Sequence, residues 1–147
     1  MYLNDYKVGM EFPLEPISLS KEEIISFAKV FDPRPIHVDE EEAKKSRFGG
    51  IIASGFHATS ACWGQYVHLK HDEKGVIAGK GIQDLKWHKP VYPDMMLYGV
   101  VTITKIVPYD DGSKGTVFFE MVVKDEKDEL VMIMNSSSLI AASEDVE

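Results

Sequence analysis

The pattern of apolar residues changes its period near residue 80, and this change limits the folds that the chain can adopt. Before it, apolar residues recur at helical spacing, as at Ile24, Phe27, Ala28 and Phe31. After it, apolar and polar residues alternate within four segments, at about 85–87, 95–104, 117–123 and 130–141. Four successive strands joined by short polar turns are predicted, and they indicate an α+β domain with an antiparallel meander on a core.

The first half predicts three helices and a short edge strand. Ser20 and Glu23 form a capping pattern for a helix that should end at Asp32, because Pro33 follows. Asp39 caps a second short helix at 40–46, and the longest helix covers 55–70. This last helix is apolar on most sides, so we expect it to be buried. Pro13 and Pro16 place an edge strand within residues 1–19.

An acid and an imidazole lie close together after the first helix. Asp32 and His37 are separated by a segment that contains Pro33 and Pro35. Proline fixes its own φ and disfavours helical geometry in the residue before it, so we expect this segment to be extended and stiff. A stiff segment would hold the carboxylate and the imidazole in one geometry, as a pair acting on one water molecule requires.

Gly55 stands at the expected start of the longest helix. The first N–H groups of a helix have no partner within it and carry the positive end of the helix dipole. A glycine there lets a ligand oxygen approach those groups closely. We therefore interpret Gly55 as a candidate oxyanion site, which together with Asp32 and His37 suits the addition of water next to a polarised carbonyl.

The strings D-P-R-P-I-H, D-E-E-E-A and F-G-G-I-I-A-S-G, between residues 32 and 55, resemble the hydratase 2 motif of MaoC-like dehydratases and (R)-specific enoyl-CoA hydratases. The later string W-H-K-P-V-Y-P-D is similar to a strand and turn of the same family. The resemblance implies a hotdog fold, a curved antiparallel sheet wrapped around a long central helix, in a single domain spanning 1–147. It also implies that Asp32 and His37 bind the water that is added to an enoyl thioester, and that the Gly55 N–H binds the thioester oxygen.

The same resemblance implies an acyl-CoA thioester as substrate, with coenzyme A as part of it and no separate cofactor. Candidate substrate-binding residues are Arg34, Ser54, Phe56 and His57. Arg34 stands where the family usually has Asn, and Ser54 where it often has His. Arg34 could pair with Asp32 and weaken it as a base, or point outward and bind a carboxylate or phosphate of the substrate, which is the interpretation we favour.

Two other functions remain open from the sequence. A hotdog acyl-CoA thioesterase would use the same helix start but hydrolyse the thioester, and a non-catalytic module would bind an acyl thioester without turnover. In each case the resemblance implies a homodimer or a higher homo-oligomer, with strands pairing edge to edge.

Composition limits the partners. The 16 basic and 24 acidic residues give a net charge of −8, which argues against nucleic acid. An anionic CoA would then need local basic residues, for which the candidates are Arg34, Lys44, Lys45, Arg47 and Lys89. We expect no metal site, no membrane-spanning segment and no signal peptide. The single cysteine, Cys62, fits a reducing compartment, so a cytoplasmic protein is predicted.

Overall fold

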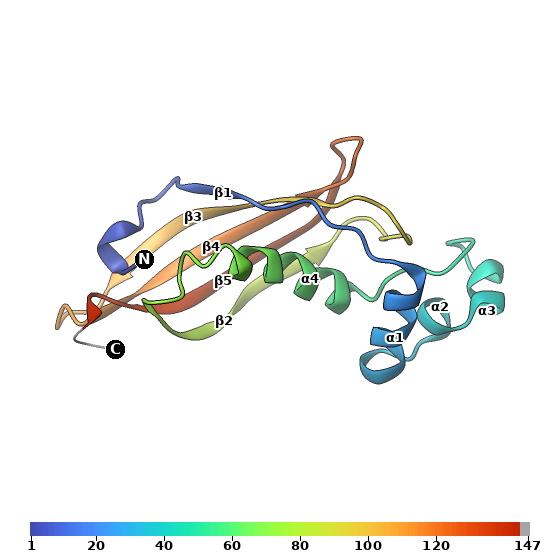
Figure 1. Ribbon diagram of the computed structural model, residues 1–147, viewed down its shortest axis with the longest axis horizontal. Helices are drawn as coiled ribbons and strands as arrows, with labels where there is room; N and C mark the ends of the chain where they lie inside the picture. Colours follow the sequence, from blue (N-terminus) through green and yellow to red (C-terminus); the bar gives the residue numbers. More distant parts are fainter. Residues whose placement is uncertain (145–147) are drawn as a thin grey trace.

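The computed structural model describes residues 1–144, in which one long helix lies on a single sheet (Figure 1). The strands are β1 (Glu11–Pro13), β2 (Val76–Trp87), β3 (Tyr98–Pro108), β4 (Lys114–Lys124) and β5 (Leu130–Ala141). The helices are the 3-10 turn η1 (Leu3–Asp5), α1 (Lys21–Phe31), α2 (Pro35–Val38), α3 (Glu40–Lys45) and α4 (Gly55–His68). Helices α1, α2 and α3 gather at one end of the molecule, beyond the start of α4 (Figure 1).

The sheet is antiparallel, with its strands in the order β1-β3-β4-β5-β2. The predicted meander is confirmed for β3, β4 and β5, and the predicted edge strand is β1. The expectation that β2 begins this meander is wrong, because β2 pairs with β5 at the opposite edge, where Leu85 faces Met134. The physical reason is that β1 already occupies the free edge of β3, with Phe12 facing Val101. Residues 88–97 therefore lead from β2, at one edge of the sheet, to β3, which lies next to β1 at the opposite edge.

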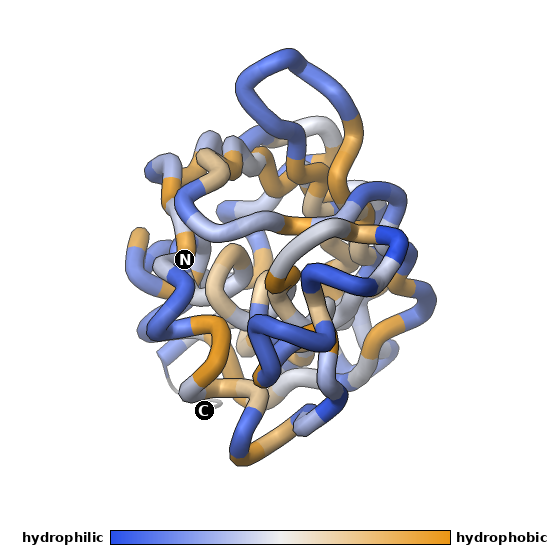
Figure 2. Tube along the Cα trace, turned by 90° about the vertical axis from the view of Figure 1, so that its right-hand side faces the viewer, coloured by the Kyte–Doolittle hydropathy of each residue, from blue (hydrophilic) through white to orange (hydrophobic). Residues whose placement is uncertain are grey.

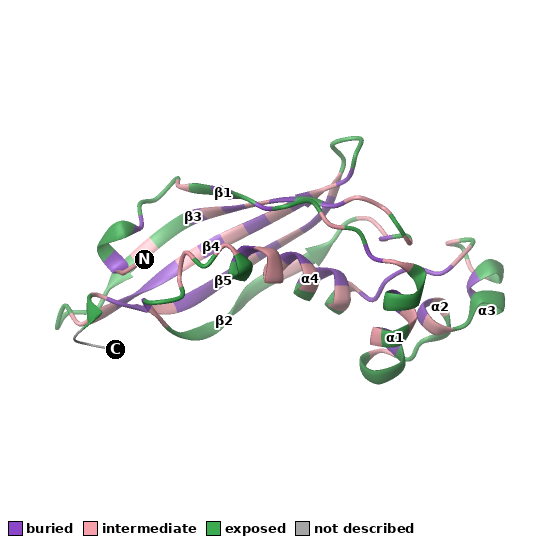
Figure 3. Ribbon diagram, viewed as in Figure 1, coloured by how far each residue is buried: buried purple, intermediate pink, exposed green. Residues whose placement is uncertain are grey.

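The core forms where α4 packs on the sheet. Ala58, Cys62 and Tyr66 recur every four residues along α4 and are all buried. The Tyr66 ring lies 5.6 Å from the ring of Phe119 in β4 and 5.7 Å from that of Phe12 in β1. Burial raises the pKa of the Cys62 thiol to about 12, which fits a packing role and not a nucleophile. Figure 3 shows buried residues in the middle strands and α4, the hotdog arrangement that the sequence predicted.

The helix boundaries follow from their caps. The Ser20 hydroxyl accepts the Glu23 N–H, and the Glu23 carboxylate accepts the Ser20 N–H, so the predicted capping box is confirmed. Asp39 accepts the first N–H groups of α3 as expected. Figure 2 views this helical end directly and shows hydrophilic and hydrophobic stretches alternating along the chain. No helix within residues 1–144 is long and apolar enough to cross a membrane.

The segment between the two prolines differs from the prediction. Arg34 is extended, with φ −73° and ψ 143°, but α2 begins at Pro35 and places His37 in a helical turn. The expectation of an extended segment up to His37 is therefore wrong. The reason is that proline suits the first position of a helix, where its fixed φ is helical and its missing N–H would have no partner.

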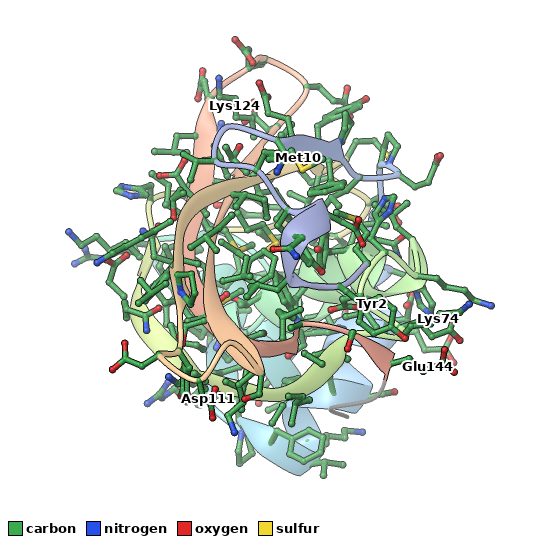
Figure 4. All side chains as sticks on the ribbon, turned by 90° about the vertical axis from the view of Figure 1, so that its left-hand side faces the viewer. Tyr2, Met10, Lys74, Asp111, Lys124 and Glu144 are labelled. Atoms are coloured by element: carbon green, nitrogen blue, oxygen red, sulfur yellow. The ribbon has the colours of Figure 1, made fainter. Side chains whose placement is uncertain are left out.

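At the end of the molecule remote from α1, α2 and α3, the first residues lie beside the connection from α4 to β2. Tyr2 and Lys74 lie on the same side of the molecule in Figure 4. A Cβ atom at Gly75 would stand 2.1 Å from the Met1 carbonyl oxygen, so the two backbones touch there. This contact is far along the chain from the residues that the sequence analysis singled out.

Candidate active site

Asp32 ends helix α1 and is fixed by two contacts. Its N–H donates to the Ala28 carbonyl at 2.8 Å, and Pro33 prevents the helix from continuing. Its side chain is only 11% exposed. The Ser54 hydroxyl donates a hydrogen bond of 2.7 Å to Asp32 Oδ2. The carboxylate is therefore held in one orientation by a charge-assisted hydrogen bond.

His37 is buried in α2, with 5% of its surface exposed. Its Nδ1 lies 2.7 Å from the Ile52 carbonyl oxygen, and its backbone N–H donates to the Arg34 carbonyl at 2.9 Å. A carbonyl oxygen can only accept a hydrogen bond, so Nδ1 carries the proton of the imidazole. The Ile52 contact thus sets both the direction of the ring and its tautomer.

The two side chains face each other, with Asp32 Oδ2 and His37 Nε2 3.5 Å apart. In a neutral imidazole that donates from Nδ1, Nε2 is unprotonated and accepts. Both facing atoms are then hydrogen-bond acceptors. A water molecule placed against them can donate one hydrogen bond to each.

Helix α4 begins beside this pair, and its first residues are unusual. Ser54 occupies the N-cap position, but its side chain makes no cap hydrogen bond, because its hydroxyl donates to Asp32 instead. The first-turn N–H groups of a helix have no partner within it. The Phe56 N–H, which an N-cap side chain could accept, is therefore not capped by Ser54, and the Gly55 N–H at the first helical position has no partner within the helix.

Trp87, the last residue of β2, covers the start of α4. Its Nε1 donates to Thr59 Oγ1 at 2.9 Å, and that hydroxyl donates to the Gly55 carbonyl at 2.7 Å. A Cβ atom at Gly55 would stand 2.3 Å from Trp87 Cε2, so only glycine fits below the indole. The sequence analysis missed Trp87, and the signal for it was the resemblance of W-H-K-P-V-Y-P-D, which places it at the end of a strand near the site.

A cavity of about 330 Å³ joins these residues. Asp32, His37 and Gly55 all line it, so the structure brings the three candidate catalytic residues to one space. Arg34 and Phe56 also line it. The remaining wall is mostly apolar and comes from four elements or connections, through Ile52, Ala58, Val91, Val131 and Met132. A cavity with a few polar groups on an apolar wall is typical of small-molecule sites.

Two candidate substrate-binding residues, Ser54 and His57, are not among the residues that line this cavity. Ser54 is fully buried and bonds Asp32, so it orients the carboxylate. The His57 ring stacks on Phe27 of α1, with centroids 4.4 Å apart and an interplanar angle of 8°. Burial lowers the pKa of the His57 imidazole below its ordinary value. Contact of either residue with a substrate stays a prediction.

Of the basic residues considered for an anionic ligand, most have acidic partners. Lys44 and Lys45 lie 3.9 and 3.7 Å from Glu41 and Glu42 in the same helix. Lys89 lines the cavity, but it bonds both Asp125 and Glu129, and these hydrogen bonds raise the pKa of its ammonium group. Within residues 1–144 there is no group of three or more His, Cys, Asp or Glu side chains that could hold a metal ion.

Arg34 is placed differently from these lysines. One of its terminal nitrogens, Nη1, lies 3.3 Å from Asp32 Oδ1, and its side chain is 72% exposed. The contact is single and not the bidentate pair that would occupy the guanidinium group fully. Of the two roles considered for Arg34, pairing with Asp32 is thus present only as a long contact.

Residues 5–125 match the family described as "MaoC like domain". The chain belongs to the MaoC-like domain family. The uncharacterised protein YdeM of Bacillus subtilis is 37% identical to this MaoC-like chain over 103 residues, which are 70% of this chain and 73% of YdeM.

Solved structures resemble this MaoC-like protein over nearly its whole length. A monoamine oxidase regulatory protein from Archaeoglobus has a TM-score of 0.91 at 28% identity, covering 97% of this chain and 95% of its own. A MaoC-like dehydratase from Rhodospirillum rubrum has a TM-score of 0.86 at 28% identity, with 96% and 97% covered. The (R)-hydratase of A. caviae, at 18% identity, TM-score 0.74 and coverage of 90% and 96%, shares the fold.

Proposed function

We propose that this MaoC-like protein is a hydratase/dehydratase that adds water to, or removes it from, an enoyl-CoA or 3-hydroxyacyl-CoA type thioester, with (R) configuration at the hydroxyl carbon. The observation that carries the proposal is the pair of facing acceptors, Asp32 Oδ2 and His37 Nε2, 3.5 Å apart in a cavity that reaches Gly55. Membership of the family supports the reaction type, as does the likeness to a protein named a MaoC-like dehydratase.

In the proposed mechanism the thioester oxygen accepts the Gly55 N–H at the start of α4. Negative charge that develops on this oxygen in the enolate-like transition state meets fixed N–H dipoles there. The water molecule lies between Asp32 and His37. As the water oxygen bonds to the β-carbon, one of its O–H bonds breaks and the proton passes to Asp32. The same proton is then delivered to the α-carbon, while His37 orients the water and helps the transfer. The reverse sequence is dehydration.

The contacts of both residues support these roles. Ser54 donates to the same Asp32 oxygen that faces His37, so the carboxylate is held in the orientation in which the water between the two residues can reach it. His37 keeps its Nδ1 proton on the Ile52 carbonyl, which leaves Nε2 free to accept from water. Pre-set orientation of this kind lowers the entropic cost of reaching the transition state.

The decisive experiment is Asp32→Asn, assayed with enoyl-CoA thioesters for 3-hydroxyacyl-CoA product and its chirality. The amide keeps the shape of the carboxyl group but cannot act as a base, so we expect a rate at least about 100-fold lower. Asp110→Asn, in the exposed turn after β3, is the matched control and should keep full activity. Unimpaired water addition by folded Asp32→Asn protein would contradict the mechanism.

The same assay separates the other two functions. Free CoA thiol that appears without any 3-hydroxyacyl product would identify a thioesterase. Binding of the thioester with neither product would identify a non-catalytic acyl-thioester module. Only formation of the 3-hydroxyacyl product supports the proposal.

We further propose that the protein is a homodimer or higher homo-oligomer, joined by edge strands. Strand β2 is at the edge of the sheet, and Ile77, Ile82 and Trp87 on it are large, apolar and exposed. Long apolar edge strands are usually covered in native proteins. The mass in solution, measured by light scattering, tests this, and a monomer at micromolar concentration would contradict it.

A further inference from the structure

Arg34 lies between the two candidate catalytic residues, and its backbone is bonded to both. Its N–H donates to the Asp32 carbonyl at 2.8 Å, and its own carbonyl accepts the His37 N–H at 2.9 Å. These bonds fix where the side chain begins. Arg34 also lines the same cavity as Asp32 and His37, and its guanidinium nitrogen Nη1 lies 3.3 Å from Asp32 Oδ1.

Most of the hydrogen-bonding capacity of Arg34 remains unused. A guanidinium group has five N–H donors in a planar fork. In residues 1–144, the acidic partner recorded for Arg34 is Asp32 Oδ1, at 3.3 Å from one nitrogen, and the side chain is 72% exposed. The group can therefore bind a second anion with its other edge while it keeps the Asp32 contact.

Lys89 is the second lysine or arginine on the cavity wall, and its ammonium group already has acidic partners. Lys89 bonds Asp125, which is buried, and also Glu129 at 2.7 Å. Its positive charge is thus matched by two carboxylates. Arg34 is the cation that the described cavity wall can offer to an anionic substrate group.

The position of Arg34 limits what this anion can be. If the water lies between Asp32 and His37, then the reacting β-carbon lies next to it, and Arg34 is in contact with Asp32. The phosphates of coenzyme A are separated from the thioester by the whole pantetheine arm. When this arm extends away from Asp32, the phosphates lie far from Arg34 while the β-carbon is at Asp32, and an anion bound by Arg34 then belongs to the acyl part of the substrate.

We propose that Arg34 binds a carboxylate at the far end of the acyl group, so that the preferred substrates are CoA monothioesters of short dicarboxylic acids. This inference extends the proposed function and depends on it, because the proposed mechanism fixes where the acyl chain lies. Arg34 supplies a planar fork that matches a carboxylate, and it lies between this carboxylate and that of Asp32. The cavity of about 330 Å³ favours a short acyl group, since it is near the lower end of ligand-site volumes.

Saturated thioesters have no double bond to which water can be added, so their binding tests the inference without turnover. Three matched pairs differ only in the terminal group: succinyl- and butanoyl-CoA, glutaryl- and pentanoyl-CoA, and adipyl- and hexanoyl-CoA. We expect at least one carboxylated member to bind the unaltered protein about 10- to 100-fold more tightly than its neutral partner in calorimetry, as a charged hydrogen bond provides. In Arg34→Gln this ratio should fall to near one.

Arg47→Gln is the matched control, because Arg47 is exposed and is not among the residues that line the cavity. Any contact of Arg47 with coenzyme A is the same for both members of a pair, so this variant should keep the preference for the carboxylated thioester. A preference that is absent from all three pairs, or that survives in Arg34→Gln, would overturn the inference. In either case, hydration of neutral enoyl-CoA by the unaltered protein would still support the proposed function. Conversely, a preference for carboxylated thioesters in a protein that adds no water would support the binding role of Arg34 and contradict the proposed reaction.

Discussion

Replacement of Gly55 by alanine tests how tightly the start of α4 is packed. The added Cβ atom would stand 2.3, 2.5 and 2.6 Å from Cε2, Cδ2 and Cζ2 of Trp87. Carbon atoms in contact prefer separations of about 3.5–4.0 Å, so the indole must move by roughly 1 Å or more. That movement strains its 2.9 Å hydrogen bond to Thr59 and its edge-to-face contact with Phe56, whose ring centroid is 5.3 Å away.

The expected cost combines two opposing effects. Overpacking costs about 1–3 kcal/mol, and a lost neutral hydrogen bond adds about 1 kcal/mol. Alanine recovers at most about 1 kcal/mol relative to glycine within a helix. We therefore expect Gly55→Ala to lower the free energy of unfolding by about 1–3 kcal/mol and to reduce water addition, since the indole must leave its place over the proposed oxyanion site.

Urea unfolding of Gly55→Ala, Trp87→Ala and the double variant, followed by circular dichroism, provides the measurement. If the indole causes the cost, Gly55→Ala should be nearly neutral once Trp87 is alanine, with a coupling free energy of at least about 1 kcal/mol. Additive effects of the two substitutions would refute the steric explanation.

Two further substitutions test the electrostatics of the fold. Ser54→Ala removes the 2.7 Å hydrogen bond to Asp32 Oδ2 and should lower kcat/KM for water addition about 10- to 100-fold. Ser60→Ala, at an exposed position within α4, is the control and should keep full activity, and equal activity of the two variants would contradict the orienting role of Ser54. Burial raises the pKa of Asp72, so the folded state loses stability as pH rises from 3.8 through that raised pKa. Asp72→Asn should therefore be more stable than the unaltered protein at pH 7 but not below pH 3.8 in urea unfolding, and a gain that does not depend on pH would refute this.

Local sequence signals predicted the elements that are decided by local contacts. The capping box at Ser20 and Glu23 and the cap at Asp39 each join residues a few positions apart, so they could be read from spacing alone. The end of α1 at Asp32 follows from Pro33 in the same way. These signals placed the carboxylate at a helix end and Gly55 at a helix start.

Contacts between distant residues could not be predicted in this way. The hydroxyl of Ser54 reaches Asp32 across 22 positions, and nothing in the string around Ser54 distinguishes that bond from an ordinary helix cap. The pairing of β2 with β5 depends on which strand already occupies the edge of β3. Even the error at Pro35 has this origin, because proline is compatible with both an extended segment and a helix start, and packing decides between them.

The way in which Arg34 is attached has a consequence for how such a site can change its specificity. Its backbone is bonded to both Asp32 and His37, but its side chain makes only a long contact with Asp32. On the proposed role of Arg34, exchange of the residue at position 34 would alter which acyl group is accepted, while the backbone that spaces Asp32 and His37 is kept. The proposed selectivity of Arg34 and the proposed reactivity of Asp32 and His37 would then be encoded two and three residues apart and could vary independently.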